Sequence, residues 1–510
     1  MLSCPGGNMD NVKGPEKADV LLINPQVDYE ALFGHVSGSI QRYEPLNLTY
    51  LAAYLEAQGI PVRICDGQVE RLTKEHMFDV LKRFQPRVVG ISCSTPLVSA
   101  SLQIAVWTKE CSPRIKVIFG GAHPTSFPRE LLESSSIDAV ATGEAEITLH
   151  EYVEAVKTSG KFHHIKGIVF KENGQIISNP ARQLLHELDR LPFPALHLLP
   201  VDEYAPALDL YSRSPSFSMI TSRGCPYRCI FCAGRLISGH QYRARSAENV
   251  LEEITLLVER YKARNIFFMD DHFLFHRTRT EQICDLMIRE GLHKRITWLC
   301  AARTDKVEED ILKKMRRAGC RMICYGIETG SQRLMDLLKK KINLDTVAEA
   351  VRMTRRAGIK TRGTFILGIP TETREESLQT IEFAKGIGID YAKFNLITPY
   401  PGTELYNFCR EQGLDFSKDW AKLIPAIGFS DQEPIFIPEG RTAEELKEVQ
   451  RRATRKFYLR PRQILNLVRN IHSAGDLKRY LAIGSAVLNP FGTGRKKSEP
   501  VVPPTADISH

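Results

Sequence analysis

The sequence predicts an α/β protein: an N-terminal doubly wound parallel sheet of five strands, then a partial (β/α)6 barrel, then a helical C-terminal region. Short β-branched apolar runs alternate with amphipathic segments in the first third of the chain. The alternation resumes after residue 216 and yields six further strands, and no strand pattern follows residue 405. Alternation of this kind is typical of parallel strands joined by crossover helices.

The first sheet is predicted from apolar runs that are rich in Val and Ile. Its expected strands cover residues 20–24, 62–66, 88–93, 115–120 and 139–142. The expected helices cover residues 46–58, 73–84, 97–111 and 128–134. Polar and glycine-rich residues follow these strands, so they meet at the carboxyl edge, where doubly wound sheets bind ligands. We assign residues 19–155 to this domain and expect residues 1–18 to be mobile.

Residues 156–210 differ in character and are expected to form a linker. Asn173-Gly174 lies between two strand-like runs, which predicts a hairpin. The two prolines of the run from residue 191 to residue 195 continue neither a helix nor a strand.

The partial barrel is expected over residues 211–404. Its six predicted strands cover residues 217–222, 266–269, 296–301, 322–327, 361–367 and 392–397. The first helix is expected to begin after Ser246, an N-cap residue type, and its apolar residues recur at the spacing of one helical face. Six units are two short of a closed barrel, so we expect an open barrel whose working end is the carboxyl rim of the strands.

Residues 405–488 are expected to be helical and residues 489–510 to form a disordered tail. The segment 451–470 carries seven Arg and Lys and no acid. Most such segments are solvated helix faces, and we favour that interpretation. The alternatives are a peripheral contact with a membrane surface, an anionic substrate or nucleic acid. In a functional role, this segment would cap the barrel mouth.

Composition excludes several classes of protein. With 43 % hydrophobic residues in 510, the chain is not disordered throughout, and the net charge of +9 is too dilute to indicate nucleic acid as a partner. No apolar run of eighteen residues occurs, and the first nineteen residues lack a signal-peptide pattern. We therefore expect a cytoplasmic protein. Nine scattered cysteines fit buried thiols in a reducing compartment: Cys4, Cys65, Cys93, Cys111, Cys284, Cys300, Cys320, Cys324 and Cys409.

The remaining three cysteines form a motif. Cys225, Cys229 and Cys232 have the spacing C-x3-C-x2-C and directly follow the first barrel strand. Three thiolates can hold three corners of a [4Fe–4S] cluster, which leaves the fourth iron free to bind a small molecule. The alternative is a structural zinc ion with His240 as fourth ligand, at a spacing that is unusual for zinc fingers.

With Phe231 before its last cysteine, this motif resembles that of the radical S-adenosylmethionine (SAM) superfamily, and the resemblance extends over residues 217–403. It implies that SAM binds the open iron and is cleaved to a 5′-deoxyadenosyl radical. It further implies SAM contacts from six residues: Phe231, Asp270, Asp271, Arg303, Glu328 and Gly368. Asp270 and Asp271 replace the glycines that this family commonly carries there. Taken singly, these residues also fit structural roles: a helix cap or ion pair for the two aspartates, a surface acid for Glu328 and a turn for Gly368.

The first domain lacks the G-x-G-x-x-G turn, which disfavours NAD. Its segments 44–52, 62–66, 120–125 and 143–146 resemble the cobalamin-binding domain that precedes the barrel in one class of radical SAM proteins. The resemblance implies cobalamin contacts from ten residues: Asn47, Leu48, Asp66, Ser94, Thr95, Gly120, Gly121, His123, Thr125 and Glu144. Without cobalamin, the sheet would serve only for docking.

Two departures from cobalamin-binding patterns bear on the cofactor. Asn47 stands where the domain usually has glycine. Cobalamin carriers that coordinate cobalt use D-x-H-x-x-G after the second strand, and the sequence here, from Asp66 to Arg71, has no histidine. Cobalt should therefore lack an imidazole from that loop. His123 could substitute, but its place in a turn favours a hydrogen-bonding role.

These cofactors imply a cobalamin-dependent C-methyltransferase that cleaves SAM with a [4Fe–4S] cluster and transfers methyl from methylcobalamin to an unactivated carbon. One alternative keeps the cofactors without methyl transfer, as in the oxidative ring cyclase of tetrapyrrole synthesis. An alternative of another class is a non-catalytic corrinoid or metal-binding sensor. The expected partners are a small-molecule substrate, large or lipidic, and an electron donor such as flavodoxin or ferredoxin; no nucleic acid is expected.

Overall fold

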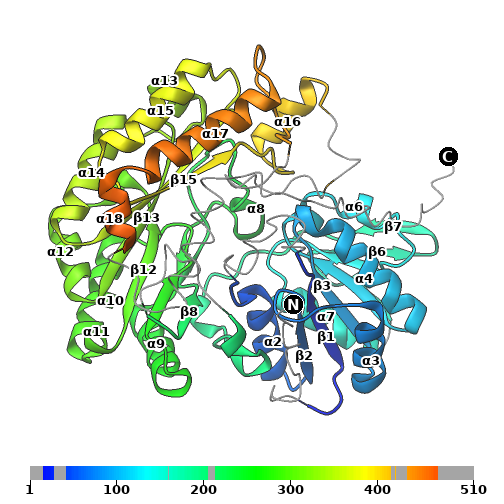
Figure 1. The fold of residues 1–510 in the computed structure, drawn as a ribbon. Helices are drawn as coiled ribbons and strands as arrows, with labels where there is room; N and C mark the ends of the chain where they lie inside the picture. Colours follow the sequence, from blue (N-terminus) through cyan, green and yellow to red (C-terminus); the bar gives the residue numbers. More distant parts are fainter. Residues whose placement is uncertain are drawn as a thin grey trace, which may run out of the picture.

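The computed structural model contains two mainly parallel sheets, each covered by helices (Figure 1). The structure describes residues 15–27, 42–158, 160–204, 213–414, 420 and 433–468, without the side chains of 466–468. The tail expected at residues 489–510, and all but residues 15–18 of the expected mobile N-terminus, lie outside these ranges.

The first sheet has seven strands in the order β2-β1-β3-β4-β5-β6-β7. The five predicted parallel strands are confirmed: β1 (Val20–Asn24), β2 (Val62–Asp66), β3 (Val88–Ser92), β4 (Lys116–Gly120) and β5 (Ala139–Ala141). The hairpin of β6 (Ile168–Glu172) and β7 (Gln175–Ser178) is not part of a linker, because β6 pairs antiparallel with β5 and extends the sheet. The prediction of a linker from residue 156 was wrong here.

The helices of the first domain lie on both faces of this sheet. They are α2 (Leu46–Ala57), α3 (Lys74–Phe84), α4 (Val98–Cys111), α5 (Ala122–Ser126), α6 (Pro128–Leu131) and α7 (Glu146–Lys157). The side chain of Thr73 accepts a hydrogen bond from His76 N, which satisfies one free donor at the start of α3. The structure adds α5 and α7 to the predicted helices.

The segment between the domains packs into the core. Its three short 3-10 turns cover Leu188–Arg190, Leu196–Leu198 and Val201–Glu203. Ala195, Leu196 and Leu198 are buried in a hydrophobic cluster that includes residues of both sheets, and Ala195 N donates to Thr49 O at 3.0 Å. This segment therefore joins the two domains through apolar contacts.

The second sheet confirms the predicted partial barrel. Its six parallel strands have the order β15-β14-β13-β12-β11-β8. They are β8 (Ser216–Met219), β11 (Asn265–Phe268), β12 (Thr297–Ala302), β13 (Cys320–Glu328), β14 (Lys360–Leu367) and β15 (Tyr391–Leu396). A two-stranded ribbon of β9 (Ser222–Arg223) and β10 (Arg243–Ala244) was not predicted. This ribbon closes the base of the loop that holds the three clustered cysteines.

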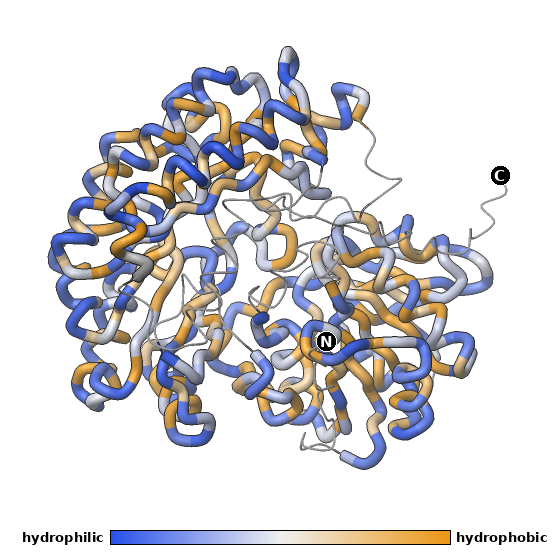
Figure 2. Tube along the Cα trace, in the orientation of Figure 1, coloured by the Kyte–Doolittle hydropathy of each residue, from blue (hydrophilic) through white to orange (hydrophobic). Residues whose placement is uncertain are grey.

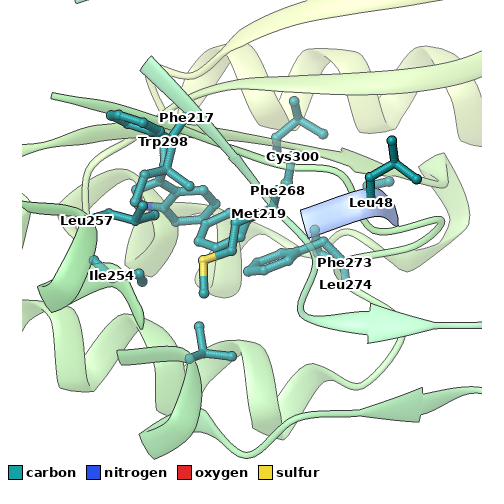
Figure 3. Close-up of a cluster of buried hydrophobic side chains, with 14 of the residues drawn as sticks. Leu48, Phe217, Met219, Ile254, Leu257, Phe268, Phe273, Leu274, Trp298 and Cys300 are labelled. Atoms are coloured by element: carbon teal, nitrogen blue, oxygen red, sulfur yellow. The ribbon is translucent and has the colours of Figure 1, made fainter. Parts of the chain in front are cut away.

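Apolar strands and amphipathic helices build the barrel core (Figure 2). Phe217, Phe268 and Trp298 from neighbouring strands pack with Ile254 and Leu257 of α9 (Figure 3). The barrel helices are α8 (Arg235–Ser238), α9 (Ala247–Tyr261), α10 (Arg277–Arg289), α11 (Leu292–Arg295), α12 (Glu309–Arg317), α13 (Gln332–Leu337), α14 (Leu344–Arg356) and α15 (Arg374–Gly386).

Three helices and no strand lie among the described C-terminal residues, as predicted. The helices are α16 (Glu404–Glu411), α17 (Ala443–Tyr458) and α18 (Pro461–Val468). Gln450 Nε2 donates to Phe394 O and Tyr458 Oη donates to Ala392 O, so α17 lies along edge strand β15. The basic segment therefore covers the side of the barrel and does not cap its mouth. No helix among the described residues is both long and apolar enough to cross a bilayer.

Glu372, in the turn before α15, is a buried carboxyl whose titration affects stability. Its oxygens accept hydrogen bonds from Ile369 N and Ser377 Oγ, and burial raises its pKa from 4.5 to about 7. Between these values the folded state holds a proton that the unfolded state has lost, so stability falls as pH rises through this window. The free energy of unfolding of the wild type should fall by roughly 3 kcal/mol between pH 4.5 and pH 8, and Glu372→Gln should abolish this fall. Urea unfolding at several pH values measures it. Exposed Glu375→Gln is the control, and an unchanged pH slope in Glu372→Gln would contradict this assignment.

Candidate functional site

The carboxyl ends of the two sheets face a common cavity of about 310 Å³. The first domain contributes the end of β3, the loops after β4 and β5 and the start of α2. The barrel contributes the turn after β8, helix α8 and the end of β11. The residues that line the cavity include Asn47, Leu48, Gly120, Gly121, Glu144, Arg223, Gly234 and Asp271. In Figure 1, α8 lies between the two sheets.

The cysteine loop connects the ribbon strand β9 to α8. Gly224 precedes it with φ +86°, and a Cβ there would overlap the backbone carbonyl of Gln241, so only glycine fits. Two backbone bonds hold the loop to the barrel: Ile230 N donates to Leu338 O, and Leu405 N donates to Ile230 O. The loop therefore has a defined path before any cofactor binds.

The three thiols are close enough to influence one another. Cys225 is half-buried, Cys229 is buried and Cys232 is exposed. Burial raises the pKa of the Cys225 thiol, and the negative charges of Asp271 and Cys229 raise it further. Within the residues that the structure describes, no three His, Cys, Asp or Glu side chains form a group that could hold a metal ion.

The chemistry of this donor set fits a cluster. Each cysteine ligand of a [4Fe–4S] cluster binds a different iron atom. Three thiols on one loop can therefore hold a cluster although they do not converge on a single point. A zinc ion needs four ligands around one point. His240 is exposed, and among the described residues it belongs to no group of side chains that could hold a metal ion.

Asp270 and Asp271 have different environments. Asp270 is buried, and its carboxylate accepts hydrogen bonds from Thr221 N, Thr221 Oγ1 and Ser222 N at 2.5–3.0 Å. It therefore supports the turn that leads into the cysteine loop. Asp271 is exposed and lines the cavity; a Cβ on Gly234 would lie 3.2 Å from its Oδ1. Of the two, Asp271 is placed to meet a ligand.

Arg303 lies beneath the cysteine loop. Its guanidinium stacks 3.6 Å from the ring centre of Tyr227, a residue of the motif to which the sequence assigned no role. It bonds to the Asp305 carboxylate and to Lys340 O. Its Nη1 is buried without a hydrogen-bond partner among the described residues. This free donor is available to an anionic group of a ligand.

His272 is a second buried group that the sequence did not identify. Its ring lies 6.0 Å from Tyr227 and 5.8 Å from Phe275, and neither ring nitrogen has a partner among the described residues. Burial, followed by the charge of Arg303, lowers its pKa to about 3, so the imidazole is neutral. Its position after Asp271 was the only available signal.

Glu328 forms a buried ion pair. It has φ +72° at a bulge of β13, and its Oε1 lies 2.5 Å from Lys340 Nζ. A Cβ on Gly326 would overlap this carboxylate, so a larger residue there would displace the ion pair. Lys340 belongs to a basic run, and no pattern marked it as buried.

Phe231 and Gly368 have packing roles. Phe231 is half-buried against a hydrophobic cluster. Gly368 has φ +76° and faces Leu446 of α17; a Cβ on this glycine would lie 3.5 Å from the leucine side chain, so the residue forms a turn beneath the C-terminal helix. Neither residue lines the described cavity.

Five of the ten predicted cobalamin contacts line the cavity: Asn47, Leu48, Gly120, Gly121 and Glu144. Asn47 Nδ2 donates to Ser92 Oγ at 2.8 Å. Gly121 has φ +122°, and a Cβ would lie 2.6 Å from Cys93 O, so the loop requires glycine. A Cβ on Gly120 would meet no atom within 4 Å, so the glycine there leaves this edge of the sheet open to a large flat ligand.

The other five lie outside the cavity lining. Buried Asp66 accepts hydrogen bonds from Asn24, Gln68 N and Tyr204, and Ser94 is exposed. Thr125 Oγ1 donates to Gly121 O and accepts from Gly143 N, so it links two loops.

His123 is buried beside Trp420, with 4.8 Å between ring centres, and its Nδ1 lies 3.4 Å from Thr95 Oγ1. Burial lowers the pKa of His123 to about 4, so this ring is neutral too.

Charged residues join the two domains beside the cavity. Both oxygens of buried Glu144 accept hydrogen bonds from the Arg243 guanidinium, each at 2.9 Å. Arg223, one residue before the cysteine loop begins, bonds to Glu144 and Glu146. Leu185 N also donates to Glu144. Glu144 therefore holds the cysteine-loop ribbon against the first domain.

Comparisons with known proteins match both halves of this arrangement. The family model of the radical SAM superfamily matches residues 219–384, and that of the B12 binding domain matches residues 39–153. A protein of Pyrococcus horikoshii named as an uncharacterized methyltransferase is 34 % identical over 82 % of this chain and 89 % of its own length. The anaerobic magnesium-protoporphyrin IX monomethyl ester cyclase of Rubrivivax gelatinosus is 27 % identical over 86 % of this chain and 77 % of its own.

A similar fold occurs in a solved structure. The radical SAM methyltransferase TsrM from Kitasatospora setae, with cobalamin and a [4Fe–4S] cluster bound, superposes with a TM-score of 0.64. The match covers 78 % of this chain and 75 % of TsrM at 19 % identity. The likeness at this identity concerns the fold, including the pairing of the two domains.

Proposed function

We propose a methyl-transfer function on the premise that this chain belongs to the radical SAM superfamily and, within it, to the proteins that carry a B12 binding domain. It is an enzyme whose cofactors are a [4Fe–4S] cluster, SAM and cobalamin. Cys225, Cys229 and Cys232 would hold the cluster. When bound, the reduced cluster supplies the electron that cleaves SAM, and cobalamin carries the methyl group.

The observation that carries the proposal is the cavity that both domains line. Gly120 and Gly121 at the edge of the first sheet face the same space as Gly234 and Asp271 beside the cysteine loop. A carbon that loses hydrogen and then receives a methyl group must reach both cofactors without leaving the protein. A shared cavity permits this, whereas two separate pockets would not.

The chain's own residues position the ligands and exclude water. Leu48, Leu51, Ile220 and Ile237 give the cavity an apolar lining. An apolar lining keeps water away from a reactive carbon. The substrate that fits such a lining is a small molecule with a substantial apolar part, and we propose a large or lipidic one.

The proposal also includes an electron donor and a cellular compartment for the protein. We assign the reducing electron to a low-potential carrier such as flavodoxin or ferredoxin. All described cysteines are free thiols, which supports a reducing compartment and hence the cytoplasm.

The second candidate function is oxidative cyclisation without methyl transfer, which the similarity to the Rubrivivax cyclase favours. Product analysis distinguishes the two. The protein is reconstituted anaerobically with iron, sulfide and hydroxocobalamin, reduced, and incubated with SAM. We expect both 5′-deoxyadenosine and S-adenosylhomocysteine. Deoxyadenosine without adenosylhomocysteine would exclude methyl transfer, and intact SAM would indicate a non-catalytic sensor.

The free Nη1 of Arg303 supports a role in binding the SAM carboxylate. We expect Arg303→Gln to weaken SAM binding by about 10-fold to 100-fold, since a hydrogen bond to a charged group contributes about 1.5–3 kcal/mol. The measurement is equilibrium binding of SAM to the reconstituted protein. Asp305→Asn is the control, because it removes the negative charge that Arg303 pairs with and keeps the guanidinium. If both variants weakened SAM binding equally, the placement of Arg303 by Asp305 would account for the effect, and a hydrogen bond from Nη1 would not be needed.

A further inference from the structure

We propose that the corner between α17 and α18 docks on an anionic lipid bilayer. This corner comprises Leu459, Arg460, Arg462, Ile464 and Leu465. Its three aliphatic side chains are 47 %, 47 % and 49 % exposed and lie within seven residues of one another. Large apolar side chains that gather at an exposed corner mark an interaction surface.

Among the described side chains of α18, residues 461–465, polar Gln463 faces the barrel: it is 1 % exposed, and its Nε2 donates to Ile389 O at 3.2 Å. The adjoining Ile464 and Leu465 consequently face outward. Two large aliphatic side chains exposed at the start of a helix are available to an apolar partner.

Cationic groups surround these side chains. Arg460 and Arg462 donate to the neutral carbonyls of Lys385 and Gly388. A Cβ on Gly388 would lie 2.8 Å from Arg355 Nη1 and 3.6 Å from Arg462 Nη1, so two guanidinium groups lie side by side. Like charges that gather in this way attract an anionic ligand.

The nearby acids neutralise this group only in part, because the described ion pairs include Arg355 and neither Arg460 nor Arg462. Glu382 is paired with Lys385 at 2.5 Å and with Lys456 at 3.3 Å. Asp390 lies 4.0 Å from Arg355, and its other oxygen accepts two hydrogen bonds from Thr361. The corner therefore presents an excess of positive charge beside its apolar side chains.

A bilayer with anionic headgroups matches both features. Its hydrocarbon accepts the three aliphatic side chains, and its phosphates accept the guanidinium groups. Nucleic acid would use the arginines but offers nothing to Leu459, Ile464 and Leu465. A second copy of this chain, docked through the same corner, would place arginines against arginines.

The corner lies on the opposite end of the barrel from the cysteine loop. Gly388 and Ile389 directly precede β15, so α18 contacts the amino ends of the strands, whereas the cysteine loop follows their carboxyl ends. Figure 1 shows α18 on the side of the barrel away from the first domain. Membrane docking is therefore independent of the proposed function, and variants at this corner should retain both cofactors.

The test is flotation of the full-length reconstituted protein with vesicles of phosphatidylcholine alone or mixed with phosphatidylglycerol. We expect binding to the mixed vesicles, and little to neutral ones. Arg460→Gln with Arg462→Gln should weaken binding about 25-fold, since each basic side chain near an anionic surface contributes a factor of about five. Ile464→Ser with Leu465→Ser should weaken it at least about tenfold through lost apolar burial.

Matched controls separate this corner from general surface effects. Leu337→Ser with Phe408→Ser removes two other exposed apolar side chains, and Arg289→Gln with Arg295→Gln removes two other exposed charges. These variants should bind within about twofold of the wild type. Retained binding by the corner variants would overturn the proposal. So would a dimer, seen by sedimentation velocity, that dissociates on Ile464→Ser, because its partner would be a second copy.

Discussion

Replacing Cys229 with alanine should reduce 5′-deoxyadenosine formation by about a thousandfold or more, while cobalamin binding stays at the wild-type level. Cys229 is the buried member of the three-cysteine loop. Its removal leaves two thiols for a cluster that needs three. Cys229 does not line the cavity, so its replacement should leave unchanged the part of the cavity that the first domain forms.

The measurements for Cys229→Ala are iron and sulfide content, bound cobalamin by absorbance, and nucleoside products by chromatography. Cys111→Ala is the matched control, because Cys111 is a half-buried thiol at the end of α4. It should retain iron and activity. Full iron content in Cys229→Ala would show that the ligand set is wrong. Loss of cobalamin together with iron would show that the two sites are not separable.

The sequence predicted the strands well because both sheets are buried. Parallel strands covered on two faces read as continuous apolar runs, and the six barrel strands begin and end close to their predicted positions. The hairpin around Asn173-Gly174 was recognised as a local structure. Its pairing with β5 depends on a contact far along the chain, to which the local pattern gives no clue. The ribbon of β9 and β10 has two residues per strand, too short for any periodicity.

The residues of the candidate site also fall into two groups, those that the sequence predicted and those that it did not. Residues at strand ends, such as Asp271 and Gly121, were predicted because their position along the chain already places them at the carboxyl edge. The environments of Lys340 and Arg243 were not predicted, since their buried pairing with Glu328 and Glu144 depends on residues distant in the sequence. Glu144 was predicted as a cobalamin contact, and its carboxylate is held by arginines. Sequence spacing indicates which residues share an edge and does not indicate which of them pair.

Replacing Glu144 with alanine should lower the free energy of unfolding by about 3–5 kcal/mol, because it leaves a buried guanidinium without a counter-charge. Arg243 is almost fully buried and bonds to both Glu144 oxygens; Arg223 keeps Glu146 as a second partner. Urea unfolding of the apoprotein measures the loss. Exposed Glu133→Ala is the control and should change stability by less than about 0.5 kcal/mol.

The pH dependence of this loss has a defined sign. Burial opposes ionisation of Glu144, but the arginines outweigh it and hold its pKa below 4.5. The unfolded carboxyl takes up its proton at a higher pH than the folded one. Glu144 therefore stabilises the fold above pH 4.5, and its contribution is lost as pH falls through the folded pKa. The difference between wild type and Glu144→Ala should shrink below about pH 4.5.

A double variant distinguishes an ion pair between domains from a direct contact with cobalamin. Arg243→Met combined with Glu144→Ala leaves no unpaired charge from this pair, so the combined loss should be smaller than the sum of the single losses by at least about 2 kcal/mol. If Glu144 instead served only the cofactor, Glu144→Ala would leave the stability of the apoprotein unchanged and weaken cobalamin binding alone. Additive losses in the apoprotein would likewise show that Glu144 and Arg243 act separately, and the cysteine loop would then need another contact to hold it against the first domain.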